Sequence, residues 1–188
     1  MNTKKKLTAK KAALLALFAA VSLIIFTIES TVPPIVPIPG VKLGLANTVT
    51  LFLVLTADKR SAFAVLIVRT VLAAVFAGQA VSFVYSIMGG ILALLAMCIA
   101  NRILNGSPIW FISAVGGIFH NIGQTAAACM LLSPASLAYL PHLLISGCIT
   151  GALTGILTDL VITKMKRSGI YETIENTFSK KERKDKNE

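Results

Sequence analysis

The length, composition and charge of this chain exclude most classes of soluble protein. Its 188 residues are 55% hydrophobic and 14% charged, with a formal net charge of +10, whereas an ordinary globular domain is about 25% charged. A chain of this size cannot bury so much apolar surface from water, and its hydrophobicity also excludes disorder. We therefore predict an integral membrane protein that lies in the lipid bilayer.

Charge divides the chain into three parts. Residues 1–11 and 164–188 hold 13 of the 18 Lys and Arg residues and 5 of the 8 acidic residues. We expect a basic cytoplasmic segment at 1–11, a transmembrane domain at 12–163 and a charged cytoplasmic tail at 164–188. The tails have the composition of topology signals that contact anionic lipid. No aromatic platform accompanies their charge, so we expect no nucleic-acid binding.

Six apolar segments lie between the tails. They approach the roughly 20 residues that a bilayer-crossing helix needs, and continuous β alternation is absent. These features predict an all-α fold, a compact bundle of six transmembrane helices. The second segment has only 15 residues, so we expect it to extend into the preceding Pro-rich loop or to be sheltered by its neighbours. The segments are 12–28, 43–57, 61–77, 80–100, 109–132 and 142–163.

The distribution of Lys and Arg predicts the orientation of the bundle. Six spans place both termini on one side of the membrane, together with the loops 58–60 and 101–108. That side then carries 16 of the 18 basic residues. Because basic residues concentrate in cytoplasmic loops, we predict a multi-pass protein of the cell membrane with both termini in the cytoplasm.

Polar residues inside the predicted spans are the candidate functional residues, because each costs roughly 2.5 to 3.5 kcal/mol when it is a charged group at a helix centre. Arg69 and Lys42 would supply two positive charges beside amide and imidazole groups. Such a set of groups is suited to bind a carboxylate, a phosphate or an electron-rich heterocycle. His120, Asn121 and Gln124 are spaced to share one helical face. Alternatively, Arg69 pairs with Glu29 or with helix carbonyls, and the polar set joins helices by hydrogen bonds. The candidate ligand contacts, which cluster in the predicted outer half, are Lys42, Asn47, Arg69, His120, Asn121 and Gln124.

Small residues recur at every fourth position in the first and last segments. Ala12, Ala16 and Ala20 form one such stripe, and a glycine stripe runs from Gly147 to Gly155. Stripes of this kind let helices approach closely. We expect the glycine stripe to serve internal packing. For the alanine stripe, an internal seam and a docking face for a partner membrane protein both stay open.

Residues for catalysis or metal binding are missing from the predicted spans. Prenyl or phosphoryl transfer needs clustered carboxylates that hold Mg²⁺, but Glu29, Asp58 and Asp159 stand alone. No Gly-Lys-Ser/Thr loop for phosphate is present, and the two histidines lie 22 residues apart with no thiol spaced to join them. We therefore expect no enzyme activity, no metal and no cofactor. We expect Asp159 and His142 to lie at membrane boundaries.

Two runs of residues resemble a known family. They are Pro37-Ile38-Pro39-Gly40-Val41-Lys42-Leu43-Gly44-Leu45-Ala46-Asn47 and His120-Asn121-Ile122-Gly123-Gln124. Both are similar to the Gx transporter family, whose members are labelled heptaprenyl diphosphate synthase component I. With six spans, cytoplasmic termini and the alanine stripe, the chain also resembles the substrate-binding S component of an energy-coupling factor (ECF) transporter. The resemblance covers nearly all of residues 9–163.

The resemblance implies a function in transport. In S components the outer helix ends and the loop after the first span enclose a vitamin-sized ligand. An alanine stripe on the first helix docks against a transmembrane scaffold protein, which two ATPase subunits drive. On this chain, Ala12, Ala16 and Ala20 would be the docking face, and residues 31–47 would cap a small vitamin-like or anionic ligand captured from outside.

The synthase label implies an alternative function. Synthesis of heptaprenyl diphosphate requires an aspartate-rich metal site, and the predicted spans contain no pair of aspartates. The chain would then be a non-catalytic membrane component associated with heptaprenyl diphosphate synthase. Its role would be to regulate the synthase or to tether it to the membrane.

Overall fold

The fold is a bundle of helices. The computed structural model describes residues 8–31, 44–78, 80–104 and 106–179, and no strand occurs within these ranges. This confirms the all-α fold class. The elements in chain order are α1 (Ala9–Thr31), α2 (Asn47–Thr56), α3 (Lys59–Ala77), α4 (Ala80–Ile103), α5 (Ile109–Leu131), the 3₁₀ turn η1 (Pro134–Tyr139), α6 (Leu140–Arg167) and α7 (Ile170–Ser179).

Three of the helical segments are long and apolar enough to cross a membrane. They are α1, α4 and the continuous segment Pro134–Arg167, which joins η1 to α6. A helix of 20 residues matches the thickness of the hydrocarbon core, so these segments identify the chain as a membrane protein. A helix also occupies each of the other predicted apolar segments. That all six cross the bilayer, with both termini in the cytoplasm, stays a prediction.

The short second segment is the centre of the bundle. Helix α2 has 10 residues, of which eight are buried, and it packs against α1, α3, α4 and α6. A helix that is apolar on all sides is stable when other helices surround it. The neighbours therefore shelter α2, as one of the two alternatives for this segment predicted. Its environment is protein, so its length does not have to match the bilayer.

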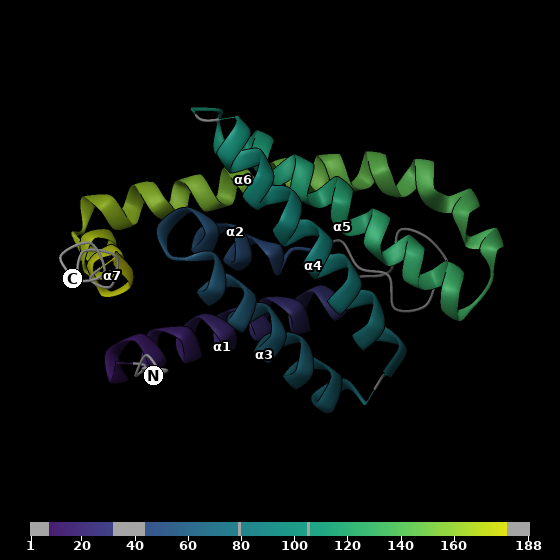
Figure 1. Cartoon of the computed structure of the whole chain (residues 1–188), viewed down its shortest axis with the longest axis horizontal. Helices are drawn as coiled ribbons and strands as arrows, with labels where there is room; N and C mark the ends of the chain where they lie inside the picture. Colours follow the sequence, from purple (N-terminus) through teal and green to yellow (C-terminus); the bar gives the residue numbers. More distant parts are fainter. Residues whose placement is uncertain (1–7, 32–43, 79, 105, 180–188) are drawn as a thin grey trace, which may run out of the picture.

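Helices α5 and α6 lie side by side because glycines line their contact (Figure 1). A Cβ atom at Gly147 would come within 2.7 Å of the carbonyl oxygen of Gly117, and one at Gly151 within 2.7 Å of the carbonyl oxygen of Ser113. A Cβ at Gly155 would meet the backbone of Trp110. The glycine stripe on α6 therefore serves internal packing, as predicted.

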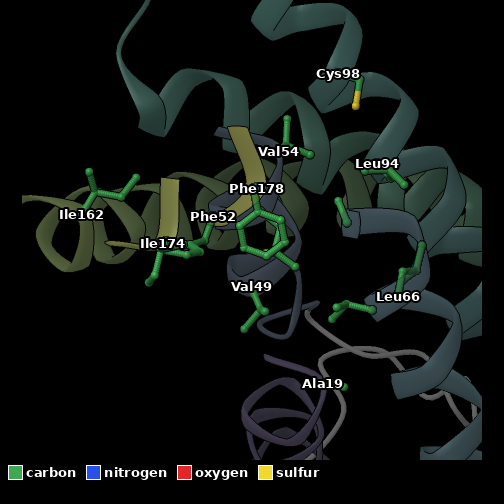
Figure 2. Packing of buried hydrophobic residues seen from close by; sticks show 13 residues of the cluster. Ala19, Val49, Phe52, Val54, Leu66, Leu94, Cys98, Ile162, Ile174 and Phe178 are labelled. Carbon is green, nitrogen blue, oxygen red and sulfur yellow. The ribbon is translucent and has the colours of Figure 1, made fainter. Parts of the chain in front are cut away.

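The charged tail predicted at 164–188 is partly folded onto the bundle. Helix α6 continues to Arg167, and Gly169, with φ of +71°, turns the chain into α7. Ile174 and Phe178, four residues apart on α7, are both buried. Figure 2 shows them beside Phe52 of α2 in one hydrophobic cluster. The apolar face of α7 therefore belongs to the core, although the segment carries mostly charged and polar residues. The division of the chain at residue 164 stays a prediction.

Lys11 joins the start of α1 to two other elements at this end of the molecule. Its Nζ atom lies 2.5 Å from a carboxylate oxygen of Asp58 and 5.0 Å from the centre of the Phe178 ring. Asp58 in turn caps α3, because its carboxylate accepts hydrogen bonds from the backbone N–H and the hydroxyl group of Ser61. The starts of α1 and α3 and the end of α7 therefore meet at one basic residue.

The glycine contact between α5 and α6 yields a prediction. Replacement Gly151→Leu forces a side chain against the α5 backbone, and overpacking of this kind costs about 1–3 kcal/mol. We expect a clear drop in the thermal unfolding temperature in detergent. Cys148→Leu, on an exposed part of the same helix, is the matched control and should change little. Equal effects of the two substitutions would contradict the close approach.

The cap of α3 yields a second prediction. Burial raises the pKa of Asp58, but hydrogen bonds from Lys11 and Ser61 outweigh this effect, so the pKa lies below its ordinary value of 3.8. A lowered folded pKa stabilises the protein above the unfolded value, and this gain disappears as the pH falls through the folded value. Wild type should thus exceed Asp58→Asn in unfolding temperature at pH 7, and the difference should begin to shrink below about pH 4 and disappear once the pH is below the lowered folded pKa. A difference that does not depend on pH would exclude the ion pair as its cause.

Candidate functional site

Buried polar residues from four helices gather in the bundle interior. Glu29 of α1, Asn47 of α2, Arg69 of α3, and His120 and Gln124 of α5 are each at most 8% exposed. Polar groups within a membrane-spanning bundle are tolerated where they pair with each other or serve a function. We refer to these five residues as the polar cluster.

Gly44 brings three members of the polar cluster together just before α2 begins. Its backbone N–H donates to the Glu29 carboxylate at 2.5 Å. Its φ of +83° is a left-handed conformation that favours glycine. A Cβ atom here would lie 2.9 Å from the His120 ring and 3.0 Å from the side-chain amide of Asn47. Only a residue without a side chain permits this approach, so the Gly44 of the predicted motif has a direct structural role.

Arg69 lies close enough to two members of the polar cluster to interact with them electrostatically. The Glu29 carboxylate attracts its guanidinium group, and His120 experiences its positive charge. However, the Nε and Nη2 atoms of Arg69 are buried and have no hydrogen-bond partner among the described residues. The attraction to Glu29 agrees with the structural alternative for Arg69. The attraction to Glu29 therefore leaves the Nε and Nη2 side of the guanidinium group without hydrogen bonds to the described residues.

The His120 ring is held between α2 and α4. A Cβ atom at Gly89 would lie 2.9 Å from the ring, so both glycines, Gly44 and Gly89, are in close contact with it. The Nε2 atom of His120 lies 3.0 Å from Nε2 of Gln124. Its Nδ1 atom is buried and makes no hydrogen bond of normal geometry within the described part of the chain, although the backbone of Gly89 lies close to the ring. The ring therefore has a fixed position and one unused hydrogen-bonding atom.

Asn121 faces a different helix from its neighbours on α5. Its side-chain amide donates to the backbone carbonyl of Leu143 on α6, and it contacts Gly147. Consecutive helical residues are turned by about 100° from one another, so His120 and Gln124 face α2 and α4 while Asn121 faces α6. The expected common face is thus wrong for Asn121, which joins helices as the structural alternative proposed.

The other predicted site residues are distributed as follows. Lys42 and most of the expected cap at 31–47 lie outside the described residues. Ala16 and Ala20 are exposed on α1 and Ala12 is half-buried. The two residues expected at boundaries, His142 and Asp159, are both exposed.

Sequence reasoning missed a polar face on α4. Ser82 and Tyr85 are buried, and their hydroxyl groups have no partner within the described ranges. Together with Ser86 and Gly89 they recur at helical spacing, which places them on one face. That spacing was the available signal, but serines and a tyrosine in an apolar segment attract less attention than charged residues. Among the described residues, no group of three or more His, Cys, Asp or Glu side chains is arranged to hold a metal ion.

Comparison with known proteins identifies the family. Residues 18–161 match the family described as heptaprenyl diphosphate synthase component I. The chain belongs to this family. The matched range starts in α1 and ends in α6, so the component I region contains the whole polar cluster and excludes α7. No curated protein and no solved structure matches the chain.

The position of Asn121 yields a prediction that tests its structural role, the hydrogen bond between α5 and α6. Asn121→Ala removes a hydrogen bond between α5 and α6, and such bonds contribute about 0.6 kcal/mol on average in membrane bundles. We expect a lower thermal unfolding temperature in detergent. Thr125→Ala is the control, because the buried hydroxyl of Thr125 donates within its own helix, to the carbonyl of Asn121. If both variants lowered the unfolding temperature equally, the hydrogen bond from Asn121 to α6 would not stabilise the protein more than a bond within α5.

Proposed function

We propose that this component I protein is the substrate-binding membrane component of an ECF-type importer. It would capture a small vitamin-like or anionic ligand from outside. The observation that carries the proposal is the polar cluster, with its unused hydrogen-bonding atoms on Arg69 and His120. Membership of the heptaprenyl diphosphate synthase component I family rests on the match over residues 18–161.

The energetic argument for a ligand starts from the unused atoms. A buried polar group without a partner costs about 1–3 kcal/mol, and more when it is charged. Seven side-chain atoms in the described residues have this status, and all but one belong to the polar cluster or to the facing surfaces of α4 and α5. The remaining atom, Oδ1 of Asn121, is on α5 beside His120. A polar ligand that paired with several of these atoms would recover that free energy on binding.

The exposed side of α1 supports the transport role. Ala16 and Ala20 lie on this side, whereas Ala19 faces the core and is 4% exposed. An internal seam would bury the stripe, so its exposure favours the docking alternative. We propose that this face binds a transmembrane scaffold protein that two ATPase subunits drive.

A second candidate function follows from the family name. The protein would be a non-catalytic membrane component associated with heptaprenyl diphosphate synthase, and family membership favours this role. It would regulate or tether a soluble, aspartate-rich synthase. The polar cluster is not required for tethering, so a bound small molecule would favour the importer.

One purification distinguishes the two functions. The full-length protein is purified from its own cells in mild detergent, and its partners and released small molecules are identified by mass spectrometry. A transmembrane scaffold with ATPase subunits supports the importer. A soluble prenyl synthase without scaffold or ATPases contradicts the importer and supports the second function.

The docking face is tested by Ala16→Leu. A leucine on the stripe prevents close approach of another helix, so we expect loss of the scaffold and ATPases from the purified complex, with normal insertion in the membrane. Ala64→Leu, at an exposed alanine on α3, is the matched control and should retain the complex. Normal assembly of Ala16→Leu would remove the docking role from the alanine stripe.

A further inference from the structure

We infer that Arg69 binds an oxyanion, a carboxylate or phosphate group of the ligand, side-on through its Nε and Nη2 atoms. The inference rests on the proposed function, because it names the chemical class of the ligand. Nε–H and one terminal N–H of a guanidinium point in the same direction and form a fork that matches two oxygens of a carboxylate or phosphate. The two unused atoms of Arg69 are the two that make up this fork.

The burial of Arg69 makes the unused fork significant. The side chain is 4% exposed, so water does not cover the two N–H groups as it would at the protein surface. Unpaired N–H groups on a buried guanidinium carry a large desolvation penalty. An arginine that served only to neutralise Glu29 could be replaced, together with Glu29, by an apolar pair at little cost. The fork therefore points to a partner that the described residues do not supply.

Glu29 and the proposed oxyanion can occupy different edges of the same guanidinium. The Glu29 carboxylate accepts the backbone N–H of Gly44 and acts on Arg69 as a nearby negative charge. A guanidinium has five N–H donors, so it can serve two anionic groups at once. Lysine has a single charged centre without a planar fork. This difference explains why arginine, and not lysine, is suited to the position.

The surroundings of Arg69 place the fork within the polar cluster. One turn before it on α3, Leu66 packs against Gly90 of α4, and the adjacent Gly89 touches the His120 ring. Tyr85 lies one turn from Gly89 on the same face of α4, and its buried hydroxyl group has no partner among the described residues. Tyr85 itself packs against Ala127 and Ala128 of α5, whereas the charge of Arg69 acts on His120. The oxyanion would therefore enter between α3, α4 and α5, on the side of His120.

The experiment measures anion-dependent stability of the full-length protein in detergent. The probes are acetate, its neutral isostere acetamide, and inorganic phosphate, added at constant ionic strength, and the readout is the thermal unfolding temperature. For wild type we expect saturable stabilisation by acetate or phosphate and none by acetamide. Arg69→Gln should abolish this effect. Arg69→Lys, which keeps the charge without the fork, should weaken binding by roughly ten- to a hundredfold.

A second arm identifies the source of the oxyanion. Wild type and Arg69→Gln are compared in nanodiscs of phosphatidylcholine and of phosphatidylglycerol. If phosphatidylglycerol stabilises wild type but not Arg69→Gln, and acetate and phosphate do nothing, the oxyanion is a lipid headgroup. Equal stabilisation by acetamide, full retention of anion binding in Arg69→Lys, or no Arg69-dependent stabilisation in either arm would overturn the inference.

One control keeps the result interpretable. The double variant Glu29→Gln with Arg69→Gln removes both charges of the pair, so neither charge is left buried without its partner. We expect this variant to be insensitive to the anions as well. If it responded to them as wild type does, the fork would not be their site. The importer proposal fails separately, through purification without scaffold and ATPases, because anion binding at Arg69 does not require those partners.

Discussion

Close approach of helix backbones at glycines is the constraint on which the structure depends. On one side of α5, Gly123 lies against the backbone of Met88 and Gly89, and on the other side Gly117 meets Gly147. A side chain at any of these positions would separate the helices. The contacts keep α5 between α4 and α6, so its polar residues face protein rather than lipid. In a bilayer, where apolar residues gain little by leaving the lipid, such packing is the main source of helix association.

Much of the fold was predictable from the sequence, because apolar segments in a bilayer have few alternatives to helices. The positions of α1, α3, α4, α5 and α6 follow from hydropathy and from the breakers between segments. The central place of α2 and the docking of α7 were harder to predict. The sequence of α2 is apolar on all sides, which predicts that the helix is buried but not which helices pack against it. In α7, two apolar residues in a charged tail suffice for docking because α2 and α6 already offer an apolar surface to them.

For the site, the choice of polar residues was predictable but their directions were not. Hydropathy marks His120, Asn121 and Gln124 as unusual, yet their spacing allows more than one face. The direction of Asn121 depends on the carbonyl of Leu143, which α6 presents. Tyr85 was overlooked because a tyrosine in an apolar segment costs little. Its importance emerges from burial and from the missing partner of its hydroxyl group.

The length of α6 has a consequence for the C-terminal part of the chain. Its 28 residues, at about 1.5 Å each, extend roughly 42 Å, whereas the hydrocarbon core of a bilayer is about 30 Å thick. If α6 crosses the bilayer as predicted, with little tilt, its last turns, with Lys164, Lys166 and Arg167, extend among the lipid headgroups. Lys166 lies over the ring of Tyr171 at 5.1 Å, which sets α7 at the same depth. Helix α7, whose Ile174 and Phe178 pack against the bundle, would then lie beside the headgroups, and its contacts with them would respond to the thickness and charge of the surrounding lipid.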